Sequence, residues 1–460
     1  MSIIIPANSA ASGGYEVSNS LRFNTASTDY LTRAASAFGT PTNRKKCTIS
    51  FWCKRSTLTV QQAVMGVETT PAGGSNEARI VLRGDDTLEF YDYQSGYKFR
   101  YITNRVFRDV NAWYNIVLVV DTTHPTGSAR VNIYINGVQE TSFSSSTDPA
   151  QNLDTFINSG NYVQLGRQST GNSYYGGYLS EYVFIDGSAL APTDFGEFDE
   201  DSGIWKPINV SGLTFGTNGF YLEFGNSGAL GTDSSGAGNT FTASNLAAID
   251  QTTDTCTNNF CLLNSIDKGY GTINFTEGNT QAAGSGSGWK PARASMGVSS
   301  GKWYWEVNMT GSNQMGVSNE TIDMDNDNAQ DLVGVTVFYN ASGGIIRTDG
   351  SQVGGTTATF ASDGSDVAGY ALDMDNKKLS IYKNGSIIVT NTALSTSITD
   401  FALPFFCVNG GGTWSVNFGN PSVALDNAGV ADGNGYGAFE YAPPSGYLAL
   451  CTANLSEELS

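Results

Sequence analysis

The sequence predicts an all-β fold with two β-sandwiches joined by a loop-rich connector. Short apolar runs alternate with turn residues along most of the chain, which is the pattern of antiparallel strands and hairpins. Of 460 residues, 54 are glycine and only 15% are charged, a composition that favours many turns over a helical bundle. One two-hairpin pattern also occurs twice, first near residue 130 and again near residue 380.

The composition also excludes several classes of protein. Lys and Arg number 24 and Asp and Glu number 43, so the formal net charge is −19. We therefore expect no nucleic-acid partner, because such partners need a basic surface, and we expect repulsion from anionic lipids. The chain has no apolar stretch of about 20 residues and no signal-peptide pattern at its start. These observations predict a soluble protein made in a cytoplasm, without membrane insertion.

Residues 1–20 are small, polar and without periodicity, and they predict an extended N-terminal arm that needs a neighbour to be ordered. Residues 21–200 are predicted to form the first sandwich. Positions 47, 49, 51 and 53 are Cys, Ile, Phe and Cys, so they share one apolar strand face and predict buried, reduced thiols. The strand-like runs of this half are 48–54, 78–82, 87–93, 113–121, 130–136, 162–166 and 177–185.

Residues 201–290 are rich in Gly, Ser, Thr and Asn, and they predict a connector that packs on its neighbours. Residues 291–460 are predicted to form the second sandwich. Its strand-like runs are 302–309, 332–339, 367–373, 378–383, 401–408 and 413–418.

The repeated pattern links the two halves. In the first half, an apolar run ends at Asp121, and a second run leads into Asn136-Gly137. In the second half, the matching runs end at Asp373 and lead into Asn384-Gly385. Asn-Gly between alternating runs predicts a type I′ hairpin turn, because both central residues need positive φ. The repetition therefore predicts two related sandwiches.

Several segments resemble known families. In the first half, Cys47-Thr-Ile-Ser-Phe-Trp52, Ile133-Tyr-Ile-Asn-Gly137 and the runs 113–121 and 177–185 resemble a laminin-G/concanavalin-A-like domain over residues 21–195. In the second half, Gly301-Lys-Trp-Tyr-Trp-Glu-Val307, Met315-Gly-Val317, Leu379-Ser-Ile-Tyr-Lys-Asn-Gly385 and Val416-Asn-Phe-Gly419 resemble a SPRY domain. Both families are jelly rolls, so the resemblance implies two concanavalin-A-like jelly-roll sandwiches.

A second resemblance spans nearly the whole chain. It is carried by Leu21-Arg-Phe-Asn24, Phe184-Ile-Asp-Gly187, Asp194-Phe-Gly-Glu-Phe198, Gly219-Phe-Tyr-Leu-Glu-Phe224, Thr257-Asn-Asn-Phe260 and the run 443–455. These segments resemble virion structural proteins of tailed bacteriophages, especially marine and aquatic ones. The resemblance implies a non-enzymatic tail fibre, appendage or capsid decoration. It further implies a homo-oligomer such as a trimer, bound to other virion proteins and presenting loops to a host-surface glycan.

Two other functions stay open. Concanavalin-A-like folds include glycoside hydrolases, which need two carboxylates across the scissile bond. Related glucanases carry Glu-x-Asp-x-x-Glu, and the nearest run here is Glu197-Phe-Asp199-Glu200-Asp201-Ser202, which ends in Ser. We interpret that run as surface charge and assign no catalytic residue. The other alternative is a cellular lectin-like adhesion protein.

The candidate carbohydrate-binding residues are Tyr97, Tyr174 and Tyr175, which lie in or near loops rich in Gly, Ser and Asn. Aromatic rings there could stack on sugars, and the competing interpretation is that each ring packs in a core. The candidate metal ligands are Asp323, Asp325 and Asp327, whose alternation suits Ca²⁺. An EF-hand would need Gly at position six and Glu at position twelve, and Asn328 and Gly334 stand there. An acidic surface loop is therefore the competing interpretation, and no cofactor other than Ca²⁺ is expected.

Overall fold

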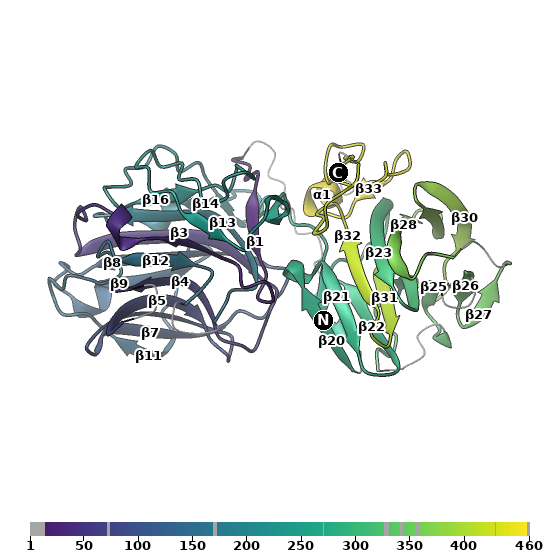
Figure 1. The fold of residues 1–460 in the computed structure, drawn as a ribbon, viewed down its shortest axis with the longest axis horizontal. Helices are drawn as coiled ribbons and strands as arrows, with labels where there is room; N and C mark the ends of the chain where they lie inside the picture. Colours follow the sequence, from purple (N-terminus) through teal and green to yellow (C-terminus); the bar gives the residue numbers. More distant parts are fainter. Residues whose placement is uncertain are drawn as a thin grey trace. The chain divides into compact units, whose positions relative to one another are not determined.

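The computed structural model describes residues 14–70, 74–168, 173–269, 271–325, 331–340, 344–355, 359–427 and 429–457. The chain divides into two compact units between Thr257 and Asn258 (Figure 1). We call them the N-terminal unit and the C-terminal unit, and each is described by itself. None of the helices among the described residues is long and apolar enough to cross a membrane.

The N-terminal unit is almost entirely made of strands. Among its described residues, the helical segments are four 3₁₀ turns, at Ala35–Ala37, Gly127–Ala129, Pro192–Asp194 and Ala248–Asp250. Its strands are β1 (Ser20–Phe23), β2 (Tyr30–Arg33), β3 (Lys46–Arg55), β4 (Gln62–Glu68), β5 (Asn76–Leu82), β6 (Thr87–Gln94), β7 (Tyr97–Val106), β8 (Trp113–Asp121), β9 (Val131–Ile135), β10 (Val138–Gln139), β11 (Phe143–Thr147), β12 (Tyr162–Leu165), β13 (Gly177–Asp186), β14 (Gly196–Phe198), β15 (Trp205–Pro207), β16 (Phe220–Leu222), β17 (Thr242–Ser244) and β18 (Gln251–Thr252).

Two large sheets of this unit face each other. The β3 sheet has the order β10-β9-β8-β3-β13-β1-β18, with β16 paired to β13. The β5 sheet has the order β11-β7-β6-β5-β4-β12-β2-β17. Figure 1 shows the sheets as two layers, with β3 and β13 in one and β5 and β7 in the other. Alternating residues of both sheets meet in one core, which includes the predicted face Cys47, Ile49, Phe51 and Cys53.

The C-terminal unit is a second sandwich, and its described helical elements include the short helix α1 (Thr452–Glu457) and a 3₁₀ turn at Glu277–Asn279. Its strands are β19 (Leu263–Lys268), β20 (Thr272–Thr276), β21 (Gln281–Ser285), β22 (Trp289–Ala294), β23 (Lys302–Thr310), β24 (Asn313–Ser318), β25 (Val335–Tyr339), β26 (Ile345–Thr348), β27 (Ser351–Val353), β28 (Asp363–Asp373), β29 (Lys378–Lys383), β30 (Ser386–Ala393), β31 (Leu403–Asn409), β32 (Thr413–Asn417) and β33 (Leu448–Ala449).

The two units share one topology. The β23 sheet has the order β20-β21-β32-β23-β28-β29-β30, and the β24 sheet has the order β19-β22-β31-β24-β25-β26-β27. In chain order, β21 to β30 match β1 to β10, and β31 and β32 match β12 and β13, with every matched strand holding the same place in its sheet. The prediction of two jelly-roll sandwiches is therefore confirmed.

The predicted Asn-Gly turns occupy equivalent places. Asn136 and Asn384 both have φ 48°, and Gly137 and Gly385 both have φ 74°, as a type I′ turn requires. Asn136 accepts a hydrogen bond from the Asn115 backbone N–H at 2.8 Å, and Asn384 accepts one from Val367 at 2.8 Å. These contacts align β8 with β28 residue by residue.

The residues predicted as a connector are shared between the two units. Residues 201–257 belong to the N-terminal unit, where β16, β17 and β18 extend its sheets. Residues 258–290 belong to the C-terminal unit, where β21 and β22 match the first strands of the other sandwich. β19 to β21 are short and their apolar residues are small or few, so they carry a weak alternating pattern.

Residues 14–19 of the predicted arm pack on the N-terminal unit. The Tyr15 hydroxyl donates to Glu181 at 3.3 Å, and the Val17 N–H donates to Thr257 at 3.1 Å. Burial raises the pKa of Glu181 to about 7. The neighbour that orders these residues is therefore the chain itself, and residues 1–13 lie outside the described residues.

Candidate functional site

The outward face of the β5 sheet carries two rows of polar and aromatic residues. The strand registers place them side by side across five strands, which at about 4.8 Å per strand gives rows about 19 Å long. We call them the outer rows. One consists of Tyr97, Tyr93, Glu77, Glu68 and Tyr162. The other consists of Arg100, Tyr91, Arg79, Gly66 and Gln164.

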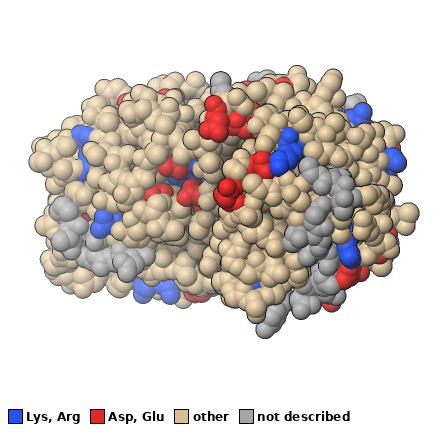
Figure 2. Space-filling model, turned by 45° about the vertical axis from the view of Figure 1, so that its right-hand side comes forward, with Lys and Arg blue, Asp and Glu red and all other residues tan. Residues whose placement is uncertain are grey.

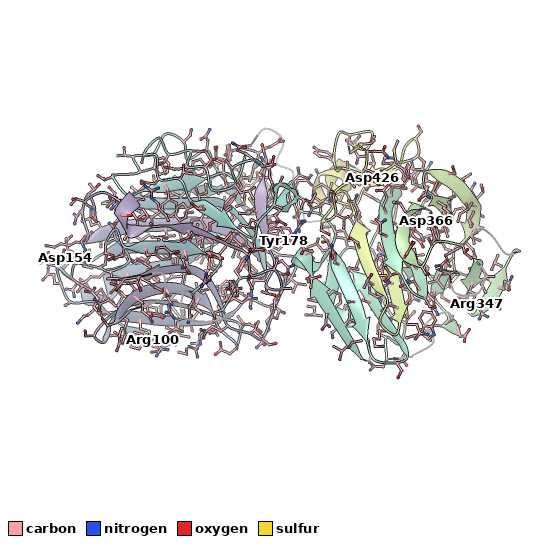
Figure 3. The ribbon with its side chains drawn as sticks, viewed as in Figure 1. Arg100, Asp154, Tyr178, Arg347, Asp366 and Asp426 are labelled. Atoms are coloured by element: carbon pink, nitrogen blue, oxygen red, sulfur yellow. The ribbon has the colours of Figure 1, made fainter. Side chains whose placement is uncertain are left out.

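Tyr97 is the exposed aromatic residue of these rows, with 46% of its surface accessible. The rings of Tyr91 and Tyr93 meet its ring edge-on, with centroids at 5.5 Å and 5.2 Å. The Arg100 guanidinium lies 4.7 Å from the centroid of the Tyr97 ring, and Figure 3 labels Arg100 on β7. The Tyr97 ring is thus held in one place, which lowers the entropy lost when a ligand binds.

Arg79 pairs with two glutamates of the outer rows. Arg79 donates to Glu68 at 3.0 Å and also to Glu77, and the Tyr91 hydroxyl donates to Glu77 at 2.7 Å. Burial raises the pKa of Tyr91 above its usual range, so the hydroxyl keeps its proton. Arg79 and Glu68 are both buried, so this pair fixes the sheet face and is not itself open to a ligand.

Arg100 and Arg83 form a second group of ion pairs on this face, around Glu89. Arg100 donates to one oxygen of Glu89 at 2.7 Å, and Arg83 donates to the other at 2.8 Å. The arginine charges of this face are compensated, since Arg79, Arg83 and Arg100 pair with Glu68, Glu77 and Glu89, and Arg83 also lies 3.5 Å from Asp85. Such a face suits a neutral ligand rich in hydroxyl groups.

The chain borders the outer rows on the β12 side. A Cβ atom at Gly66 would lie 3.4 Å from the Arg167 carbonyl oxygen, so the backbone at residue 167 approaches the sheet closely there. The Arg167 guanidinium lies 4.6 Å from the ring centroid of Tyr30 and 5.6 Å from that of Tyr174. Tyr174 therefore lies beyond this border.

The structure places the three predicted tyrosines in different surroundings. Tyr97 belongs to the outer rows, whereas Tyr174 contacts Arg167, whose guanidinium also lies over Tyr30 of β2. Tyr175 is fully buried, and its hydroxyl donates to the Lys54 carbonyl at 3.0 Å. The suggestion that Tyr175 stacks on a sugar is wrong, because its ring packs in the core against Phe23.

The sequence does not predict most residues of the outer rows. Glu68 lies on β4 and Arg100 on β7, and neither strand was recognised. Arg79 lies in a predicted strand, where the alternation of Ala78, Arg79 and Ile80 signals an outward side chain. That signal alone names no partner, since the pairing of Arg79 with Glu68 depends on strand register.

The predicted calcium ligands form a turn. The Asp325 N–H donates to the Asp323 carboxylate at 3.0 Å, as in an Asx turn, and Asp327 lies outside the described residues. Among the residues that the structure describes, no group of three His, Cys, Asp or Glu side chains could hold a metal ion. The Ca²⁺ site therefore stays a prediction.

Two carboxylates with shifted pKa values, Asp199 and Glu306, are relevant to the enzyme alternative. Hydrogen bonds from Ser202 lower the pKa of Asp199 to about 2, so this group is not a protonated acid at neutral pH. Burial raises the pKa of Glu306 to about 7, as in a general acid. However, each Glu306 oxygen already accepts two hydrogen bonds, and the four donors are the N–H groups of Glu440 and Tyr441, the Asn417 amide and the Tyr304 hydroxyl. This arrangement anchors a loop.

Charged side chains are sparse on the surface. Figure 2 shows a face on which uncharged residues predominate and acidic and basic side chains occur in small groups. This surface is consistent with a composition in which 15% of residues are charged.

Comparison with known proteins finds similarity to parts of the chain. Residues 24–194 match the family described as the concanavalin A-like lectin/glucanases superfamily. The search of curated protein sequences found no match. Three solved structures are similar to parts of the chain. The SPRY domain of human HERC1 is 19% identical, with 34% of this chain and 96% of that chain covered and a TM-score of 0.28.

Two further solved structures are also similar to parts of the chain. Stonustoxin is 18% identical, with 34% of this chain and 27% of that chain covered and a TM-score of 0.29. A "putative carbohydrate binding protein" from Bacteroides ovatus is 16% identical, with 50% of this chain and 58% of that chain covered and a TM-score of 0.36.

Proposed function

We propose that this protein is a non-enzymatic, carbohydrate-binding structural component of a tailed-phage virion, either a tail fibre or appendage or a capsid decoration. It is made in the host cytoplasm, assembles as a homo-oligomer on the particle, and contacts other virion proteins. The observation that carries the binding function is the outer rows of the β5 sheet, where Tyr97 is exposed among paired arginines and glutamates.

The chemistry of the outer rows supports a glycan as ligand. An exposed ring such as Tyr97 packs on the C–H face of a sugar, and a partly exposed polar group beside it, such as Arg100, bonds the sugar hydroxyls. The virion assignment rests on the sequence resemblance to phage structural proteins. The non-enzymatic assignment is supported by Glu306, whose oxygens are occupied by the loop that it anchors.

The binding test uses the full chain and a glycan array, followed by isothermal titration calorimetry with the best ligand. We expect Tyr97→Ala and Arg100→Ala each to weaken this binding by tenfold or more, which is about 1.4 kcal/mol. Arg105→Ala is the matched control, because Arg105 also lies on β7 and pairs with a glutamate, Glu140, outside the outer rows. Equal affinities for the three variants and the parent chain would refute this site.

The virion assignment has its own test. Mass spectrometry of purified particles of the phage that encodes this sequence should detect the polypeptide, and its absence would refute the assignment. Immunogold labelling then separates tail from capsid. Release of reducing ends from a bound polysaccharide, lost on substitution of a single carboxylate, would show an enzyme instead.

A further inference from the structure

The outward face of the β23 sheet contains a groove. One end of this face is covered, because Tyr304 and Ala371 pack under Phe439 and Ala449. Next to them, Glu306 holds the backbone at Glu440 and Tyr441. Beyond Glu306 the face is open, with two hollows of about 260 Å³ and 200 Å³.

The two hollows form one groove, since they share Asn308, Gly364, Ser415 and Val423. Their volumes together reach the range of about 300–1,000 Å³ typical of small-ligand sites. The groove runs between residues 363–367 and residues 421–426, and Figure 3 labels Asp366 and Asp426 on these two segments.

The equivalent face of the N-terminal unit is closed. There Val117 and Val183 lie under Phe195, Val210 and Phe215, which the chain brings back across the β3 sheet. The aligned hairpins place Trp52 where the C-terminal unit has Asn308, and Lys54 where it has Thr310. Trp52 and Lys54 are both buried, whereas Asn308 and Thr310 are half-buried in the groove.

The floor of the groove consists of uncharged hydrogen-bonding side chains. The Asn308 amide is fixed by hydrogen bonds to the carbonyls of Gly364 and Asp366 at 3.2 Å and 3.3 Å. The hydroxyls of Thr310 and Thr413 lie 2.8 Å apart. Ser415 and Gln281 complete this floor.

The groove has no positive charge, since none of the described residues that line it is Lys or Arg. Two of its carboxylates have structural partners: Glu306 anchors the backbone described above, and Glu440 accepts the N–H groups of Asp426 and Asn427. Val423 adds an apolar surface on the rim, with 44% of its surface accessible. Amides, hydroxyls and one apolar wall suit a neutral polyhydroxylated ligand better than an anionic one.

We propose that this groove is a second carbohydrate site, which binds a neutral oligosaccharide and makes the chain bivalent. The groove and the outer rows share no residues, so each site is tested by itself, whereas the bivalency rests on the function proposed above.

The test starts from the full chain carrying Tyr97→Ala and Arg100→Ala, which removes the first site. Isothermal titration calorimetry is run with maltohexaose, cellohexaose, laminarihexaose and mannohexaose, and with hexagalacturonate as the anionic control. We expect one equivalent of at least one neutral hexaose to bind, and no binding of hexagalacturonate.

Two further substitutions locate that binding. Ser415→Tyr fills the floor, and Val423→Arg obstructs the exposed rim without touching the core; each should weaken binding by tenfold or more. Val353→Arg is the control, because Val353 is equally exposed on β27, outside the lining of the groove. Unchanged thermal unfolding of Val423→Arg excludes a folding defect.

Three results would overturn the proposal. No neutral hexaose binds at millimolar concentration, or binding persists in Ser415→Tyr and Val423→Arg. The third is binding of hexalysine alone, abolished by Asp426→Asn, which would identify a basic peptide as the ligand. In the first case, if the parent chain does bind a hexaose and Ser415→Tyr leaves that binding unchanged, the outer rows are the functional site and only the groove is refuted.

Discussion

The fully buried ion pair between Lys54 and Asp254 should be a large contributor to the stability of the N-terminal unit. Neither side chain is accessible to solvent. The Lys54 ammonium lies 4.7 Å from the Tyr178 ring centroid and 5.5 Å from that of Trp113, and the Trp113 indole N–H donates to Asp254 at 3.3 Å. The pair holds the segment after β18 across the outward face of the β3 sheet.

The substitution Lys54→Met removes the charge, keeps most of the volume and leaves Asp254 buried beside aromatic rings. Breaking a buried pair in this way costs about 3–5 kcal/mol, because one charge loses its partner without regaining water. Lys46→Met is the matched control at the other end of β3. Its ammonium pairs with Asp121 at 3.0 Å, but a third of the Lys46 side chain is exposed, so we expect a cost of about 0–1 kcal/mol.

Urea unfolding, followed by hydrogen–deuterium exchange of β3 and β13 peptides, measures the N-terminal unit separately from the other unit. With an m-value of about 3 kcal/mol/M, Lys54→Met should lower the midpoint by about 1–1.7 M. The double substitution Lys54→Met with Asp254→Leu should recover most of the loss, since an apolar pair carries no desolvation penalty. Similar midpoints for Lys54→Met and Lys46→Met would refute the reasoning.

Two further predictions concern backbone and pH. Gly137→Ala should lower the free energy of unfolding by about 2–5 kcal/mol, because φ is 74° and a Cβ would lie 2.3 Å from the Trp205 ring. Gly203→Ala is the control, because Gly203 has φ 69° but lies in open space. Calorimetry should show a cost of only about 1–2 kcal/mol for this variant. Burial raises the pKa of Glu181 and of Glu306 to about 7 from 4.5, so the folded state binds more protons than the unfolded state between these values. The free energy of unfolding of each unit should therefore fall by up to about 3 kcal/mol as pH rises from 4.5 through 7. Urea midpoints measured at pH 5 and pH 7.5 test this. The difference between the two midpoints should be far smaller for the N-terminal unit of Glu181→Gln and for the C-terminal unit of Glu306→Gln.

The fold was largely predictable because strand alternation and turn chemistry are local signals. The run 113–121 coincides with β8 and the run 378–383 with β29, and both Asn-Gly turns have the expected conformation. Strands such as β21, with the sequence QAAGS, carry no comparable alternation. They become strands because β32 offers them a hydrogen-bonding edge, which is a tertiary effect.

The candidate site was less predictable, because register and burial create it. Tyr174 and Tyr175 look equivalent in sequence, yet adjacent residues of an extended chain point to opposite sides, and only Tyr175 enters the core. The outer rows depend on residues of β4 to β7 and of β12 meeting on one face of a sheet. Sequence separation hides this proximity, whereas the hairpin turns impose it.

The shared topology makes the difference between the two units informative. In the C-terminal unit, the outward face of the β24 sheet is apolar and covered, with Val337 and Phe405 packed under Ile322. That sheet is equivalent to the β5 sheet, whose outward face carries Tyr97, Arg100 and their ion pairs. Conversely, the covered β3 sheet is equivalent to the β23 sheet with its open groove. The open faces thus lie on non-equivalent sheets and share no residues by alignment. The two proposed sites therefore use different residues of a repeated fold, and we expect a ligand of one site to fail to compete at the other.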